Sequence, residues 1–163
     1  MPTNNYGRLP EGMNSQTLYD YWDKLDSSLT DEEKAGILGN LWEESKFNPN
    51  ALNGEFKGLN QMNSNIMKQF PANYGAWNNA DNVFRYINDY ATGRTPKIKK
   101  GAGKDEWSGN LGYRQNLYLA APRKTAADSA RAWHTYYERA NAGYGPRVAH
   151  ANLIYAHMKA KNA

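Results

Sequence analysis

The fold is decided by residues 35–51, whose sequence is AGILGNLWEESKFNPNA. Its apolar first half predicts an α-helix, and the polar second half predicts an immediate end to that helix. Upstream, Thr30 and Glu33 have the spacing of a capping box, in which each side chain binds the backbone amide of the other residue. Downstream, Pro49 disfavours helical geometry in Asn48. We therefore expect one helix that begins after Thr30 and ends in the quoted Glu-Glu-Ser.

The two adjacent carboxylates on this helix face different environments. Successive side chains of an α-helix turn by about 100°, so Glu43 is expected to point into solvent. Glu44 falls at the edge of the apolar stripe, next to Ile37 and Leu41. Partial desolvation raises the pKa of a carboxyl, and a protonated carboxyl can serve as a general acid. The alternative is that Glu44 simply marks the end of the apolar face.

Periodic apolar positions predict further helices on both sides of this segment. Residues 48–64 are rich in Asn and Gly, which predicts a loop with a small, irregular β hairpin. The predicted helices are residues 15–28, Thr30 to 44 or 45, 63 or 64 to 70, 78–90, 110–120, 125 onward and 147–159. This count of roughly six to eight helices with a minor β element places the fold in the mainly α class.

The length of 163 residues is typical of one domain. We expect a single domain at residues 15–163 after an irregular N-terminal arm at residues 1–14, where Pro, Gly and Asn are frequent. The chain has no Cys, which excludes disulfides and thiol chemistry. It has no apolar run of the roughly 20 residues that cross a membrane, and its N-terminus lacks a signal-peptide core. Membrane insertion is therefore not expected.

The net charge is +4, which favours an anionic partner in general. The densest basic group, at residues 97–100, is short, so nucleic acid is not an expected partner. The three His residues form no close pair with carboxylates, and neither a metal site nor a cofactor is expected.

Residues 44–51 and 58–61 read ESKFNPNA and GLNQ. They resemble the signature E-S-x-F-x-P-x-A followed by G-L-x-Q of the lysozyme-like superfamily, versions of which occur in goose-type lysozymes and soluble lytic transglycosylases. With Gly-Asn-Leu at 39–41 and Tyr-Glu-Arg at 137–139, the chain most resembles the phage tail lysozyme family. The resemblance is close over residues 35–62 and loose over residues 130–151.

This resemblance implies a lysozyme-like helical domain whose hairpin lines a sugar-binding groove. It also implies cleavage of the β-1,4 bond between N-acetylmuramic acid and N-acetylglucosamine in peptidoglycan. Glu44 matches the catalytic acid, which protonates the departing glycosidic oxygen. The candidate substrate-binding residues are Ser45, Gly58, Asn60, Gln61, Asn63 and Tyr137.

Several of these assignments have alternatives. Ser45 can serve in ordinary helix capping, and Gln61 can brace its own loop. Asn63 stands where goose-type lysozymes have an Asp, and an amide cannot act as a base. Glu55 is the nearest remaining candidate for a second catalytic carboxylate, although a solvated loop charge is its alternative. Without a second acid, the acetamido group of the substrate can assist, as in lytic transglycosylases, to give an anhydro product.

Three classes of function follow from the sequence. The first is a phage muramidase, acting as a lysin or in the virion, with a lytic transglycosylase as its close variant. The second is a catalytically inactive module that binds cell walls or builds the virion, and the third is a helical domain that binds nucleic acid. The expected partners are bacterial peptidoglycan and other virion or tail proteins. The expected location is the virion, or the host cytoplasm before release, with action at the bacterial cell wall.

Overall fold

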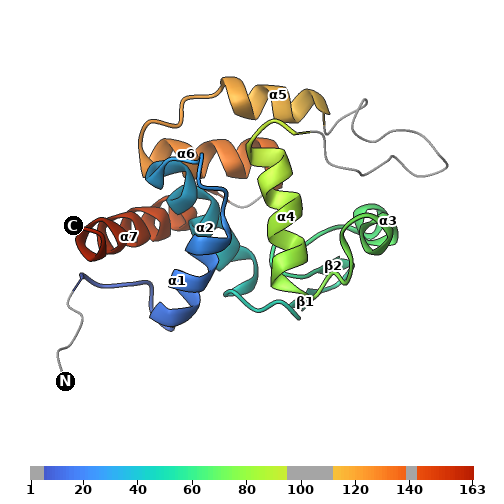
Figure 1. Ribbon diagram of the computed structural model, residues 1–163, viewed down its shortest axis with the longest axis horizontal. Coiled ribbons are helices and arrows are strands. Elements are labelled where there is room, and N and C mark those ends of the chain that lie inside the picture. Colours follow the sequence, from blue (N-terminus) through green and yellow to red (C-terminus); the bar gives the residue numbers. More distant parts are fainter. Residues whose placement is uncertain (1–5, 95–111, 139–142) are drawn as a thin grey trace.

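The computed structural model describes residues 6–94, 112–138 and 143–163. These residues form seven α-helices, one short π-helix and a two-stranded antiparallel hairpin (Figure 1). The predicted mainly α fold with a small hairpin is confirmed, whereas the basic group at 97–100 lies outside the described residues. The elements are α1 (Ser15–Lys24), α2 (Asp31–Ser45), β1 (Leu52–Asn53), β2 (Phe56–Lys57), α3 (Ser64–Tyr74), α4 (Ala80–Ala91), α5 (Gly112–Ala120), α6 (Ala126–Trp133), the π-helix η2 (His134–Glu138) and α7 (Gly145–Lys161).

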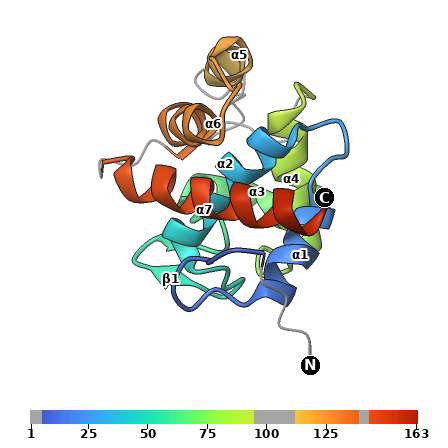
Figure 2. The same cartoon turned by 90° about the vertical axis from the view of Figure 1, so that its left-hand side faces the viewer.

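Helix α2 is the central helix of the molecule, and its start follows the predicted capping box. Thr30 Oγ1 accepts a hydrogen bond from Glu33 N at 3.1 Å, and Glu33 Oε1 accepts one from Thr30 N at 3.0 Å. Helices α6 and α7 pack directly against α2. Helix α5 lies beyond α6, and the hairpin lies on the opposite side (Figure 1). In Figure 2, α7 crosses in front of α2.

Two glycines of α2 allow this close packing. A Cβ atom at Gly36 would lie 2.6 Å from the backbone of Ser129 on α6, and one at Gly39 would lie 2.8 Å from the backbone of α7. Real Cβ atoms essentially never approach another atom within 3.0 Å, so a larger residue at either position would force the helices apart. Glycine costs about 0.5–1 kcal/mol relative to Ala in a helix interior, and the packing of α6 and α7 offsets that cost.

Because α6 and α7 cover the glycine face, α2 is buried on all sides between Ala35 and Trp42. The sequence pattern predicts one apolar stripe, and the large side chains of that stripe are buried as expected. The structure adds that Gly36, Gly39 and Asn40 are also buried. Hydropathy does not reveal this second face, since glycine has no side chain and Asn40 is polar.

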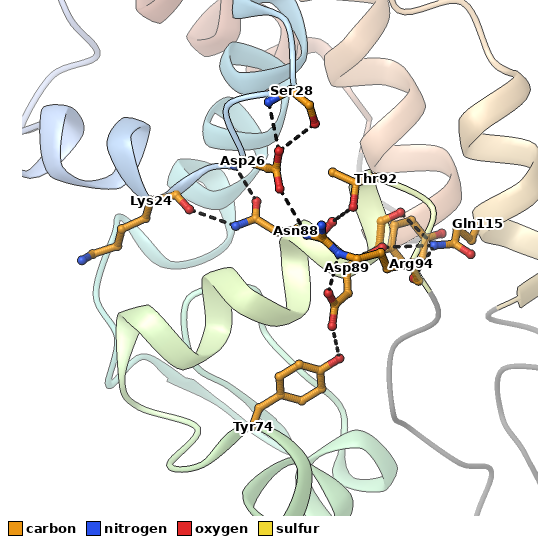
Figure 3. A network of polar contacts seen from close by, with 10 residues as sticks. Lys24, Asp26, Ser28, Tyr74, Asn88, Asp89, Thr92, Arg94 and Gln115 are labelled. Carbon is orange, nitrogen blue, oxygen red and sulfur yellow. Dashed lines mark hydrogen bonds and ion pairs between the residues drawn. The ribbon is translucent and has the colours of Figure 1, made fainter.

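Most predicted helices are present within one turn of their expected ends, but α1 ends at Lys24 rather than at residue 28. Asn88 of α4 explains the difference, because its Oδ1 accepts from Asp26 N and its Nδ2 donates to Lys24 O, both at 2.9 Å. Asp26 also accepts hydrogen bonds from the backbone and hydroxyl of Ser28. Figure 3 shows this network, whose other labelled members are Tyr74, Asp89, Thr92, Arg94 and Gln115.

Helix α3 continues through Pro71 to Tyr74, although the sequence predicts its end at Phe70. Proline lacks a backbone N–H and disfavours helical geometry in the residue before it. Here the rings of Phe70 and Tyr74 stack with their centroids 5.2 Å apart, and both contact the ring of Tyr86 on α4. This aromatic packing extends the helix by one turn.

Candidate active site

The C-terminal end of α2 carries Glu44 and leads directly into the loop before the hairpin. Lys46 (φ 52°) and Phe47 (φ 62°) adopt the left-handed conformation and end the helix, rather than Pro49 as predicted. Such residues cost about 1–3 kcal/mol each and cluster at functional sites. Phe47 is held by its buried ring and by Tyr21, whose hydroxyl donates to Phe47 O at 3.2 Å.

The side chain of Glu44, near the C-terminal end of α2, faces Arg147 in the first turn of α7. This side chain is 15% exposed, and its Oε1 atom lies 2.7 Å from Nη2 of Arg147. Burial raises the pKa of the Glu44 carboxyl, the charge and hydrogen bond of Arg147 oppose that rise, and Glu43 adds to it. Because burial is the largest effect, the carboxyl keeps its proton to higher pH than an exposed Glu does. This arrangement is chemically suited to donate a proton.

Arg147 is a residue of this site that the sequence pattern does not single out. It is 4% exposed, and its Nη1 donates to Oδ1 of Asn40 at 3.2 Å, one helical turn before Glu44 on α2. Asn40 is fully buried, and its Nδ2 donates to the backbone oxygens of Gly36 and Ala130. A cation in the first turn of a helix is unfavourable next to the helix dipole, which draws attention to Arg147 but does not identify its partner.

Glu43 occupies a different environment from Glu44. Its side chain is 31% exposed, and its Oε2 lies 3.3 Å from Nδ1 of His150 and 3.8 Å from Nζ of Lys46. The prediction that Glu43 points into solvent is therefore met only in part. Burial lowers the pKa of His150, and Glu43 opposes that effect. Glu44 is therefore the more buried of the two carboxyls, and it faces the permanent positive charge of Arg147.

Gly58 and Gln61 shape the loop that follows the hairpin. Gly58 has φ 88°, and its N–H donates to Ala51 O at 2.9 Å. Gln61 has φ 49°, and its Nε2 donates to Gly58 O at 3.0 Å. These bonds show that Gln61 braces its own loop. Its Oε1 atom is buried without a hydrogen-bond partner in the described residues.

The π-helix η2 brings Tyr137 to the same loop. Asn60 is 2% exposed, and its Nδ2 donates a hydrogen bond to the hydroxyl of Tyr137. The Tyr137 ring stacks on Trp133 with centroids 4.2 Å apart, and carbonyls of η2 accept hydrogen bonds from Arg114. π-Helical turns are rare and frequently occur at functional sites. Two predicted candidates, Asn60 and Tyr137, are thus brought together, whereas Arg139 lies outside the described residues.

The remaining candidates, Ser45, Asn63 and Glu55, form hydrogen bonds with residues close to them in the sequence. Ser45 is buried, and its Oγ donates to the carbonyl oxygen one turn earlier in α2 at 3.0 Å, which is ordinary helical bonding. Asn63 caps α3 through its side-chain oxygen. Glu55 is exposed at the turn of the hairpin and accepts a hydrogen bond from Ser64 Oγ at 3.3 Å. Within the described ranges, no hydrogen bond or ion pair joins Glu55 or Asn63 to Glu44.

Other potential ligand groups are sparse. Among the residues that the structure describes, His, Asp and Glu form no group of three that could hold a metal ion. In the same residues, no helix has the length and apolar character needed to cross a membrane. His134 of η2 is 7% exposed, and burial together with the charge of Arg147 lowers its pKa. We infer that the imidazole of His134 is neutral at neutral pH.

Comparison with known proteins gives the site its context. The family model of the phage tail lysozymes matches residues 13–158, nearly the whole chain. Comparisons with curated proteins and with solved structures give no significant match. The matched region contains α2 with Glu44, the hairpin and the first turn of α7 with Arg147. The chain therefore belongs to the phage tail lysozyme family, which indicates a lysozyme-like, cell-wall-degrading function.

Proposed function

We propose that this protein is a muramidase that cleaves the β-1,4 bond between N-acetylmuramic acid and N-acetylglucosamine in bacterial peptidoglycan, with Glu44 as general acid. The observation that carries this proposal is the environment of Glu44. Its carboxyl is the more buried of two adjacent ones, and burial raises its pKa against the opposing effect of Arg147. The family match supports the substrate class.

The chemical step requires one proton from Glu44. The protonated carboxyl gives its proton to the glycosidic oxygen, and the bond from that oxygen to the sugar C1 breaks while positive charge grows on the ring. Asn60 and Gln61 are the proposed sugar-binding amides because they match the Gly-Leu-x-Gln segment of the family signature. Their side-chain oxygens are buried without a partner in the described residues, so accepting a hydrogen bond from the sugar requires the loop at residues 58–61 to open.

A lytic transglycosylase acting on the same bond is the second candidate. The observation that favours it is the placement of Glu55 and Asn63, the two candidates for a second catalytic group. In the described part of the chain, Glu55 is bonded to Ser64 at the hairpin turn, and Asn63 caps α3. If neither activates a water molecule, the substrate acetamido group assists, and the product carries an anhydro sugar.

The role of Glu44 is tested by a matched pair of variants. Glu44→Gln keeps the size of the side chain but removes the proton, and we expect the clearing of purified cell walls to fall by about 100- to 10,000-fold. Glu43→Gln changes the neighbouring carboxylate and should retain most of the activity. Circular dichroism checks that both variants fold. Wild-type clearing by a folded Glu44→Gln protein would refute the assignment.

The product distinguishes the two reactions and a third, inactive alternative. Mass spectrometry of digested peptidoglycan should show fragments that end in a reducing N-acetylmuramic acid if water attacks, and in anhydro-muramic acid if the acetamido group does. An inactive wall-binding or virion structural module would sediment with cell walls and release no soluble fragments. The family match is consistent with action in the virion, where other virion or tail proteins are the proposed partners.

A further inference from the structure

Arg147 connects two polar side chains of α2 that lie one helical turn apart. Its Nη1 donates to Oδ1 of Asn40 at 3.2 Å and to the backbone oxygen of Asn40 at 3.4 Å. Its Nη2 lies 2.7 Å from Oε1 of Glu44. A guanidinium is planar and presents its donors in a fixed fork, so anchoring one nitrogen sets the direction of the other. The orientation of Glu44 is therefore coupled to that of Asn40.

Asn40 is itself fixed by two other backbone groups. Its Nδ2 donates to Gly36 O at 2.8 Å and to Ala130 O at 3.0 Å, and the residue is fully buried. The amide nitrogen has two hydrogens and both are used, so the amide oxygen must face Arg147. Helices α2, α6 and α7 together thus determine where the guanidinium lies.

This geometry decides which oxygen of Glu44 can carry the proton. An arginine can only donate hydrogen bonds, so Oε1, which faces Nη2 of Arg147, must act as an acceptor. In the protonated acid the carbonyl oxygen is the stronger acceptor, so Oε1 is favoured as the carbonyl oxygen and the hydrogen resides on Oε2.

We infer that Arg147, anchored by Asn40, is a positioning residue that directs the proton of Glu44 to Oε2 and faces the negative charge formed when that proton leaves. The inference rests on the proposed role of Glu44 as general acid. In that step the O–H bond of Glu44 breaks and the proton binds the glycosidic oxygen. The bond between C1 and that oxygen then breaks, and its electron pair stays on the oxygen. Glu44 becomes a carboxylate next to the guanidinium.

The other charged and titratable groups nearby belong to α2, α7 and η2. Glu43 is adjacent on α2, with His150 of α7 and Lys46 at the helix end within 4 Å of its Oε2. Burial and the charge of Arg147 lower the pKa of His134 on η2, so its imidazole is neutral at neutral pH. In the described residues, Arg147 is the cation in direct contact with the acid.

The first test measures the acid directly and needs no enzyme activity. Carbon-13 NMR titration would follow the Glu44 carboxyl, assigned by its loss in Glu44→Gln. In Arg147→Met the pKa of Glu44 should rise by about one unit or more, because a cation within about 4–6 Å typically lowers a carboxyl pKa by about 1–3 units. Arg147→Lys should keep it near the wild-type value. The control is Lys159→Met, which removes an exposed cation near the other end of α7 and should leave the pKa of Glu44 unchanged.

The second test uses the rate of wall clearing against pH. Activity falls at high pH as Glu44 loses its proton, so Arg147→Met should move this alkaline limb upward. Its rate on the acidic side should fall by about 10- to 100-fold, because a misplaced catalytic group reacts slowly. Arg147→Lys should restore the position of the limb but not the rate, since an ammonium has no fork to bind both partners.

The outcomes separate this inference from simpler ones. A folded Arg147→Met protein with an unshifted or lowered pKa of Glu44 would overturn it, as would full activity in Arg147→Lys. If Arg147→Met does not fold, the rate of wall clearing by Arg147→Lys tests the inference: a reduced rate supports it and the wild-type rate overturns it. A merely structural arginine would lower Tm without moving the titration. If the wild-type protein releases no wall fragments, the proposed function fails, while the titration still reports on Arg147.

Discussion

Replacing Gly39 by Ala should destabilise the protein, although Ala is the better helix former. The added Cβ would lie 2.8 Å from both Ala151 N and Arg147 O, which are backbone atoms of α7 and cannot rotate away. Inserting a methyl group into such a contact typically costs about 1–3 kcal/mol. The change also removes the helix penalty of glycine, about 0.5–1 kcal/mol. The net loss of unfolding free energy is therefore between about 0 and 2.5 kcal/mol, with a central value of about 1 kcal/mol.

Thermal unfolding and wall clearing measure the two consequences. For a protein of this size the central value corresponds to a Tm lower by about 2–4 °C. Activity should fall with it, because the displaced turn of α7 carries Arg147 away from Glu44. Gly145→Ala is the matched control, since a Cβ at Gly145 meets no atom within 4 Å. A Tm of Gly39→Ala equal to or above that of the wild type would refute the reasoning on helix contact.

Two further predictions concern stability. Because burial raises the pKa of Glu44, the folded state binds this proton more tightly than the unfolded chain, and the stabilisation is lost as pH rises from about 4 through the raised value. The Tm of Glu44→Gln relative to the wild type should therefore increase from pH 4 to neutral pH, and a difference that is constant or shrinks would contradict this. Tyr137→Phe keeps the ring stack but removes the acceptor of the buried Asn60 amide, so chemical denaturation should show a loss of about 1–3 kcal/mol. The control Tyr113→Phe alters a side chain that is 65% exposed and should change stability by less than about 0.5 kcal/mol; equal effects would contradict the assignment.

Features set by neighbouring residues are well predicted from the sequence. The capping box of Thr30 and Glu33 is present as expected, and Thr125 caps α6 by accepting from the Asp128 amide at 3.0 Å. Helical phase also identifies Glu44 as more buried than Glu43. These properties depend on residues within one or two turns, and so the local spacing contains the needed information.

Features set by distant contacts are not predictable in this way. The left-handed pair Lys46 and Phe47 ends α2 without any glycine, because the buried Phe47 ring and the Tyr21 hydroxyl fix the backbone. The partnership of Arg147 with Glu44 joins residues far apart in the sequence, and no spacing rule connects them. In both cases tertiary packing overrides or supplements the local preference.

The pKa of Glu44 depends on how α6 and α7 pack against α2, because burial and Arg147 of α7 are its largest influences. Gly36 and Gly39 bring the backbones of α6 and α7 close to α2. That closeness lets Asn40 bind a carbonyl of α6, and Asn40 in turn anchors the arginine that faces Glu44. Gly36, Asn40 and Glu44 are spaced by single helical turns and lie on one face of α2, and Gly39 lies next to Asn40. A substitution that alters only the separation of these helices should consequently alter the pKa of a carboxyl that it does not touch.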